Sequence, residues 1–307
     1  MACPDNLLDV RSLCALSGVS RSGYYGHVRR GCAVCDREEQ DRADFELILA
    51  AYRFRGYDKG VMGIHMRLLR QGILMNHKKI RRLMRKYGLC CPIRKANPYR
   101  RMAKAIRTNA VADNSLQRRF REHGPRKVFL TDITYIPLGR DFCYLSVIKD
   151  AYTKQALSHV LSPSLEVDFV LETVHKLFRD HGVSIDDRAM IHSDQGCHYT
   201  SVAFRELVGN YGLRQSMSRR GNCWDNAPQE SFFGHMKQEL RPKMTGCNSF
   251  DNIRAAIDDW IDYYNNDRYQ AGLGKLSPNE YYTYITTGEL PASLLQFSHF
   301  FHRVSLT

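Results

Sequence analysis

The sequence contains no long hydrophobic run. None of its 307 residues lies in a stretch that approaches the ~18 consecutive apolar residues needed to span a membrane, and no secretion signal is evident. We therefore expect a soluble, unexported protein with no membrane partner. The sequence also lacks three successive heptads, so a coiled-coil zipper, if one is needed, has to come from another segment.

Disulfides are not expected either. The chain has ten cysteines, but without a secretion signal these are better explained as reduced thiols. Cys32 and Cys35 form a CxxC pair, for which Cys90 and Cys91 are the conceivable partners. Adjacent cysteines are a poor second pair for zinc, so we do not favour a zinc site.

Acidic residues are scarce in one segment. Residues 51–127 hold 22 Lys and Arg against 3 Asp and Glu, so the formal net charge of +13 arises there. Such a concentration is typical of a surface that binds a polyanion, because each contacted phosphate releases counterions. A basic face that is merely solvated usually intersperses both signs. The segment therefore favours a nucleic-acid partner.

The centre of this basic segment has the pattern of a helix-turn-helix. Residues 57–89 predict two helices that meet at Gln71-Gly72, with Asn76 as the cap of the second. Ile80 and Leu83 belong to the buried stripe of that second helix, whose remaining surface is cationic. The residues that we predict to contact DNA are Lys78, Lys79, Arg81, Arg82 and Arg85. A helix that touches only phosphates would show the same pattern.

A smaller helical hairpin is predicted near the amino terminus. In residues 9–30, Gly18 marks a turn and Ser20 can cap the second helix. The pattern fits a helix-turn-helix and equally a packing hairpin with no role in DNA binding. Residues 36–46 are acidic and predict the start of a surface helix that leads into residues 45–52.

From Val128 onward the pattern changes to strands. Three antiparallel strands are predicted over 128–136, 142–150 and 155–161, followed by alternating helices and short strands. Asp132 is in phase with the apolar Val128 and Leu130, so a period of two points it into the protein. An inward-facing carboxylate is costly unless it is paired or binds a metal.

Two further acids lie downstream, with 35 residues between them. Asp194 follows a short apolar run that predicts a buried strand, and Glu230 lies near the start of a predicted helix. Lys237 follows Glu230 by two helical turns, so both side chains leave the same face. Three acids from distant segments predict a cage for divalent ions, because Mg²⁺ and Mn²⁺ prefer carboxylate oxygen. Two such ions can support an in-line displacement at phosphorus.

These motifs resemble a known family. The strings 131–135 (TDITY), 192–196 (HSDQG), 199–201 (YTS) and 216–233 (SMSRRGNCWDNAPQESFF) are similar to those of DDE transposases of bacterial insertion sequences. The resemblance is to the OrfB-type protein of the insertion-sequence-three group, which is related to retroviral integrases. Residues 263–265 (YYN) and 276–278 (LSP) belong to the same pattern.

The resemblance implies a fold and a reaction. The fold is α/β, with a ribonuclease-H-like core built on a mixed five-stranded sheet and preceded by small helical helix-turn-helix domains. Asp132, Asp194 and Glu230 would bind two Mg²⁺ ions, for which Mn²⁺ can substitute, to cleave DNA and transfer a strand. Beside the DNA we expect Lys237 and a loop with Arg219, Arg220 and Asn222.

Partners and domain divisions follow from the same resemblance. We expect double-stranded DNA of element ends and target, a homo-oligomer on paired ends, an OrfA-type fusion or partner segment, and a cytoplasmic, nucleoid-associated protein. The expected divisions are 1–44 (helical), 45–95 (basic helix-turn-helix), 96–124 (basic linker), 125–285 (catalytic core) and 286–307 (tail).

Alternatives remain at this point. A nuclease of the same fold would cut without joining, and a DNA-binding regulator would carry an inactive site. Asp150 and Asp225 lie in similar strings, but turn or capping hydrogen bonds explain them adequately. His192 is better explained as a supporting neighbour of the site than as a metal ligand.

Overall fold

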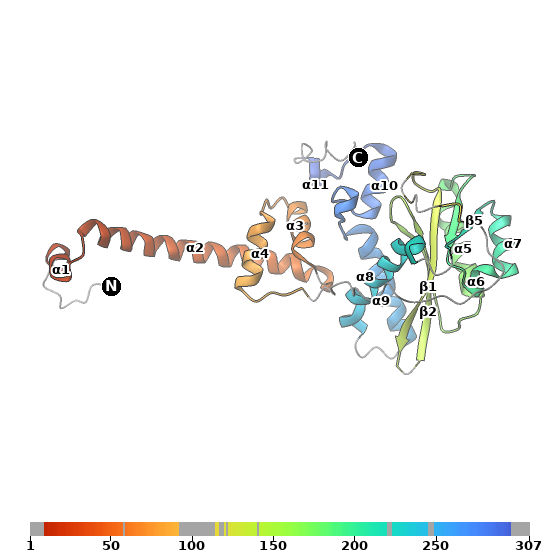
Figure 1. The fold of residues 1–307 in the computed structure, drawn as a ribbon, viewed down its shortest axis with the longest axis horizontal. Coiled ribbons are helices and arrows are strands. Elements are labelled where there is room, and N and C mark those ends of the chain that lie inside the picture. The colour runs from red at the N-terminus through yellow and green to blue at the C-terminus, as the bar shows by residue number, and fades with distance from the viewer. Residues whose placement is uncertain are drawn as a thin grey trace.

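The computed structural model describes residues 9–57, 59–91, 114–116, 120, 122–139, 141–219, 223–244 and 249–295. A helical amino-terminal part leads into an α/β part (Figure 1). Within the described residues, no helix is long and apolar enough to cross a membrane.

A mixed five-stranded sheet forms the centre of the α/β part. Its strands are β1 (Val128–Leu138), β2 (Asp141–Asp150), β3 (Ala156–Ser162), β4 (Met190–Ser193) and β5 (Arg214–Met217). The spatial order is β3-β2-β1-β4-β5, with β1 to β3 antiparallel and β4 and β5 parallel to β1. The predicted sheet, including its three leading antiparallel strands, is confirmed.

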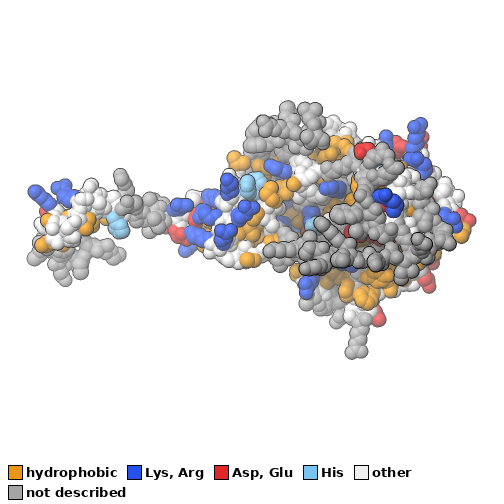
Figure 2. Space-filling view, in the orientation of Figure 1, with side chains coloured by type: hydrophobic (Ala, Val, Ile, Leu, Met, Phe, Trp, Pro, Cys, Tyr) orange, Lys and Arg blue, Asp and Glu red, His pale blue; other side chains and the backbone are white. Residues whose placement is uncertain are grey.

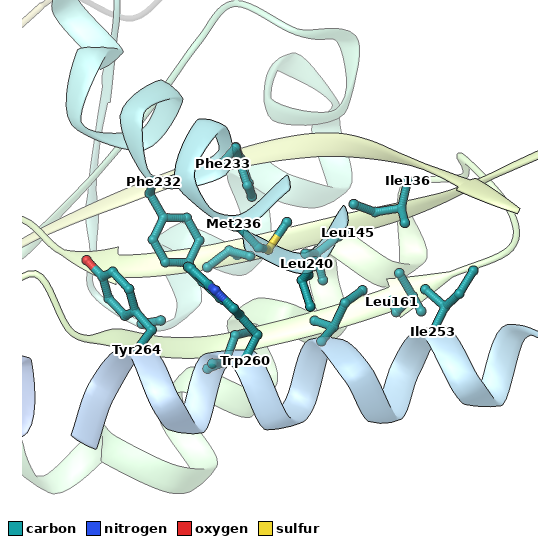
Figure 3. Close-up of a cluster of buried hydrophobic side chains, with 14 of the residues drawn as sticks. Ile136, Leu145, Leu161, Phe232, Phe233, Met236, Leu240, Ile253, Trp260 and Tyr264 are labelled. Carbon is teal, nitrogen blue, oxygen red and sulfur yellow. The ribbon is translucent and has the colours of Figure 1, made fainter. Parts of the chain in front are cut away.

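Helices cover both faces of this sheet. On one face, α5 (Asp168–His181) and α7 (Val202–Asn210) pack over a core that includes Phe129, Val174 and Phe204. The opposite face is covered by α8 (Ala227–Met244) and α9 (Phe250–Asn266), whose apolar side chains interleave above β1, β2 and β3 (Figure 3). The fully buried Trp260 lies in this second core, with its ring against those of Phe232 and Tyr264.

The amino-terminal part begins with an unusually long helix. A short helix α1 (Val10–Ser17) ends at Gly18, and α2 (Arg21–Arg53) then continues for 33 residues, away from the rest of the molecule in Figure 1. The surface helix predicted to begin in residues 36–46 and to lead into residues 45–52 is thus part of α2, which begins earlier, at Arg21. No proline interrupts residues 21–53, so the backbone hydrogen bonds continue without a break. The helix passes through the expected division between residues 44 and 45.

Two short helices complete this part. They are α3 (Val61–Arg70) and α4 (His77–Lys86), and Asn76 caps α4 by accepting a hydrogen bond of 2.8 Å from the backbone N–H of Lys78. Ile80 and Leu83 are buried against Ile48 of α2 and Ile64 of α3. The two predicted helices over residues 57–89 and their buried stripe are confirmed.

The helical part docks on the α/β part of the chain through ion pairs. At the end of α2, the guanidinium of Arg55 lies 2.7 Å from Asp259 and 2.9 Å from both Asp262 and Asp267. Arg70 of α3 binds Glu280 of α10 (Pro278–Thr287) at 2.6 Å. The last described helix, α11 (Ala292–Leu295), buries Leu294 against Leu69 of α3. The tail beyond residue 295 lies outside the described residues.

Candidate active site

Asp132 lies in the middle of β1 and faces the helix α8. It is half-buried, and its Oδ1 accepts a hydrogen bond of 2.8 Å from the backbone N–H of Ile133. Burial, together with the negative charges of Asp194 and Glu230, raises the pKa of this carboxyl to about 7, although Lys237 and the hydrogen bond from Ile133 act in the opposite direction. Three acids and one lysine from distant segments therefore lie within electrostatic range of one another.

The register of two parallel strands brings Asp194 to this position. The last paired residues of β1 and β4 are Leu130 and His192. Asp132 lies two residues after Leu130, and Asp194 lies two residues after His192. Neighbouring strands lie ~4.8 Å apart, so equivalent positions on them are close together. Asp194 is exposed, and its Oδ1 accepts a hydrogen bond of 2.9 Å from the backbone N–H of Gly196.

Glu230 and Lys237 come to the site on one helix. Glu230 lies in the first turn of α8, and Lys237 is exposed two turns later, as their spacing predicts. The amide of Gln229, next to Glu230, donates a hydrogen bond of 3.2 Å to the backbone carbonyl of Val147 on β2. Because Gln229 is buried, this contact fixes the start of α8 over the sheet.

The three acids fit the chemistry of a divalent-metal site. None of Asp132, Asp194 and Glu230 forms an ion pair with another described residue, so their charge is left for a cation. Their oxygens are the ligands that Mg²⁺ prefers. Among the described residues, however, no three Asp, Glu, His or Cys side chains already surround one metal position. The raised pKa of Asp132 reflects its burial together with the negative charges of Asp194 and Glu230, which Lys237 offsets only in part.

His192 is buried next to the site and makes no contact with the three acids among its hydrogen bonds. It is fully buried, with Nδ1 3.0 Å from Oγ of Ser216, and Nε2 3.1 Å from both Oγ of Ser218 and the backbone oxygen of Asp225. Burial lowers the pKa of this imidazole. His192 therefore ties β4 to β5 and to the segment before α8. Ser216 and Ser218 were not predicted to have a role, although their spacing of two on a strand is the signal that they share a face.

Asp225 anchors the loop that precedes Glu230. It is buried, and its Oδ2 accepts hydrogen bonds from the backbone N–H of Arg219 at 3.0 Å and from the amide of Asn114 at 2.8 Å. The Arg219 side chain also pairs with it at 3.1 Å, although most of that side chain is exposed. Asp150 has a similar turn-forming role, with hydrogen bonds from the backbone N–H groups of Arg126 and Tyr152. Hydrogen bonding thus explains both acids.

Two of the predicted DNA contacts in this loop cannot be placed. Arg220 and Asn222 lie outside the described residues, as does most of the expected linker 96–124. The side chains of Cys32 and Cys35, within α2, are also not described, whereas Cys90 and Cys91 form no disulfide with a described residue.

The cations of α4 divide into two stripes. Lys79, Arg82 and Lys86 face α2, where they pair with Asp44, Asp41 and Glu38. The other stripe, at the same spacing, is exposed and consists of Lys78, Arg81 and Arg85. Lys and Arg side chains gather over α4 in Figure 2. Of the five predicted DNA contacts on this helix, Lys79 and Arg82 are therefore engaged within the protein.

Comparisons with known proteins match both parts of the chain. Integrase core domain families match residues 122–223 and 211–278, and an HTH-like domain family matches residues 39–97. The chain is 30% identical over 264 residues to "Putative transposase InsK for insertion sequence element IS150" of Escherichia coli (strain K12), covering 86% of this chain and 89% of that one. It is 27% identical over 277 residues to "Transposase InsF for insertion sequence IS3A" of the same organism, covering 89% and 93%. The chain belongs to the DDE transposases of the insertion-sequence-three group.

The family membership inferred from the sequence motifs is thus confirmed, as is the ribonuclease-H-like α/β fold. Among solved structures, the chain is also similar to the HTLV-2 integrase catalytic core domain in complex with magnesium. That likeness has a TM-score of 0.41 and 18% identity, and it covers 51% of this chain and 97% of the other. In this transposase, the HTH-like match includes both α3 and α4, so the basic helix α4 lies within a DNA-binding type of domain.

Proposed function

We propose that this transposase cleaves DNA at the ends of an insertion element and joins the freed 3′ ends to target DNA, with Asp132, Asp194 and Glu230 as its catalytic residues. One observation carries the proposal. Asp132 is held within electrostatic range of Asp194, Glu230 and Lys237, and its pKa is raised to about 7 by burial and by the charges of the two other acids. Membership of the transposase family gives the substrate class.

The roles of the residues follow from their positions. Asp132, on the rigid centre of the sheet, and Glu230, on α8, would bind Mg²⁺ from two sides, and Asp194 would close the site from the turn after β4. Two Mg²⁺ ions bound there, or Mn²⁺ in their place, would activate the attacking oxygen and stabilise the leaving one. Lys237 leaves α8 on the side of Glu230 and would hold a phosphate of the DNA backbone.

DNA would contact the chain at two further places. The exposed cations Lys78, Arg81 and Arg85 would contact DNA from α4, with Lys79 and Arg82 retained only if their ion pairs to α2 open. Arg219 would contact DNA from the loop before α8, together with Arg220 and Asn222. We further propose residues 45–95 as the end-binding domain and residues 125–285 as the catalytic domain, joined by a basic linker over 96–124.

The assembled enzyme would be larger than one chain. The family resemblance supports an oligomer on paired element ends and an OrfA-type partner or fused segment, which would supply a zipper if one is needed. The site of action would be the bacterial nucleoid.

One assay separates this proposal from its alternatives. Purified protein is incubated with labelled element ends, target DNA and Mg²⁺, and we expect joined products. Cleavage without joining would favour a nuclease, and binding without cleavage would favour a regulator with an inactive site. We expect Asp194→Asn to bind DNA normally and to lose both reactions, whereas Asp180→Asn, at the exposed end of α5, retains them. Wild-type rates in Asp194→Asn would refute the metal assignment.

A further inference from the structure

A cavity lies on the other side of α8 from the candidate active site. It has a volume of about 600 Å³ and is formed between the ends of β1 and β2, the helix α8 and the end of α9. Pro228, Ser231 and His235 line it at helical spacing, whereas Glu230 and Lys237 belong to the opposite side of the helix. This volume is within the range of small-molecule sites and exceeds what one phosphate fills.

The cavity contains a buried lysine without an acidic partner. Lys149 of β2 is only 3% exposed, and its Nζ donates a hydrogen bond of 3.2 Å to the backbone oxygen of Pro228 and lies 4.6 Å from the centre of the Phe232 ring. It forms no ion pair with a described residue. A buried ammonium without a counter-charge is costly, so its presence needs an explanation. Burial and the nearby Lys154 and Arg268 lower its pKa to about 7.

Other groups in the cavity also favour an anion. The Nε2 of Gln270 is buried; it lies close enough to the Tyr264 hydroxyl to favour the ionised form of that phenol, but its geometry is poor for a hydrogen bond to any described residue. Lys154 donates to the oxygen of the same amide at 3.3 Å, which directs the Nε2 donor away from that lysine. Phe232 and Tyr264 lie side by side, with ring centres 4.8 Å apart (Figure 3), and form an aromatic wall.

The charged groups around Lys149 do not neutralise it. Two acids line the cavity, Glu122 and Asp150, and neither forms an ion pair with Lys149. The oxygens of Asp150 accept backbone hydrogen bonds from Arg126 and Tyr152, and Arg268 is paired with Glu239 outside the cavity. Burial lowers the pKa of His235, so it adds little positive charge at neutral pH. Among the described cations that line the cavity, Lys149 therefore carries a charge that no described acid neutralises through an ion pair.

We propose that this cavity binds the phosphate group of a nucleotide, with Lys149 and the Gln270 amide as its ligands and the Phe232–Tyr264 wall beside the attached nucleoside. The nucleotide is either part of a DNA strand or free. Phosphate binding in this cavity does not depend on the proposed cleavage and joining reactions, because its proposed ligands are Lys149 and Gln270 and no divalent ion is needed.

Phosphate binding is measured on the full chain in the presence of a chelator. Inorganic phosphate is titrated at constant ionic strength against chloride, by calorimetry and by the midpoint of thermal unfolding. We expect phosphate to raise the midpoint of the wild type. Lys149→Met keeps the apolar stem and removes the charge, so we expect at least tenfold weaker phosphate binding and an unfolding midpoint no lower than that of the wild type without phosphate. Lys127→Met, an exposed lysine outside the cavity, is the matched control and should respond like the wild type.

A second variant protects the test against misfolding. Gln270→Leu removes only the amide donor, and we expect roughly threefold or greater weakening of phosphate binding. Wild-type phosphate affinity in either variant would overturn the proposal, as would an equal response to phosphate and chloride in the wild type.

The source of the phosphate is then determined by competition. A short single-stranded oligonucleotide that displaces inorganic phosphate from the wild type, with Lys149→Met lacking this effect, identifies a DNA strand as the ligand. An oligonucleotide that leaves phosphate binding unchanged identifies a free nucleotide or phosphate. Failure of the strand-joining assay would leave both results intact, so the two proposals fail separately.

Discussion

The guanidinium of Arg82 binds the carboxylate of Asp41 through two hydrogen bonds, of 2.6 and 2.7 Å. This pair holds α4 against α2 and, together with Lys86, keeps the pKa of Asp41 far below its usual range. The other stripe of α4, which consists of Lys78, Arg81 and Arg85, takes no part in this pairing and is exposed. One stripe of cations on α4 thus stabilises its packing against α2, and the other stripe is exposed to a binding partner.

The two stripes of α4 should respond differently to substitution. Replacing Lys78, Arg81 and Arg85 by Ala should weaken DNA binding and reduce the slope of log affinity against log salt by about one for each phosphate that the helix no longer neutralises. Arg82→Ala should chiefly lower the unfolding temperature, because it breaks the pair with Asp41. Filter binding over a salt series, with thermal unfolding of each variant, tests this division. An unchanged salt slope in the triple variant would contradict it.

Gly196 should control the position of Asp194. A Cβ at residue 196 would lie 2.9 Å from Oδ1 of Asp194, which is closer than such atoms approach in proteins. The carboxylate can move away, so Gly196→Ala should cost little stability but lower DNA cleavage about 10- to 100-fold, as expected for a misplaced catalytic group. Gly209→Ala in α7, where a Cβ meets nothing within 4 Å, is the control. Equal cleavage rates in Gly196→Ala and Gly209→Ala would show that Gly196 does not control the position of Asp194.

Asp132 should make stability depend on pH when no divalent ion is present. Its pKa is raised from the ordinary 3.8 to about 7, so the folded chain binds this proton more tightly than the unfolded chain does. The resulting stabilisation is complete below about pH 4 and disappears as the pH rises to about 7. Asp132→Asn should remove this part of the pH dependence, as measured by urea unfolding from pH 4 to 8 with a chelator.

Mg²⁺ should counteract the loss of stability that Asp132 causes at higher pH. A cation favours the ionised carboxylates, so added Mg²⁺ should raise the unfolding temperature of the wild type more at pH 8 than at pH 5. Asp132→Asn should show a much smaller response at both pH values. If the variant and the wild type responded alike, Asp132 would not be a ligand.

Arg55 should control how firmly the helical part docks on α9. Its backbone has a φ of 56°, unusual for a residue with a side chain, and its guanidinium binds Asp259 and Asp267. Arg55→Ala should speed amide hydrogen exchange at the end of α2 and in α9, on the order of tenfold, while β1 and β2 keep their protection. Arg11→Ala, on α1, is a control that should leave both regions unchanged. Equal exchange in wild type and Arg55→Ala would show that these ion pairs are dispensable.

Periodicity was sufficient to predict much of the fold and the residues of the candidate site. Asp132 lies in phase with buried neighbours, and Glu230 and Lys237 lie on one side of a helix, because a strand and a helix each repeat at a fixed interval. The closeness of Asp194 to Asp132 depends on strand order and register, which only the family resemblance supplied.

Other features depend on tertiary contacts that no local pattern contains. Both stripes of α4 are cationic at the same spacing, so the sequence cannot distinguish the stripe that Asp41 neutralises from the one that is exposed. The acidic residues 36–46 were predicted to begin a surface helix, whereas they continue a helix that starts at Arg21, and they pair with α4. The burial of Lys149 was not predicted, because a lysine within a predicted strand gives no sign of the cavity behind it.

The uninterrupted course of α2 makes it a rigid spacer with a fixed rotational phase. Its 33 residues span about 50 Å, and each residue added or removed would turn everything attached to its far end by about 100°. The loss of a single residue would therefore rotate α1 about the axis of α2. The loss of seven residues, which is close to two full turns, would nearly restore the orientation of α1 on a shorter helix. The length of α2 therefore affects the orientation of α1 more strongly than its distance from the rest of the chain.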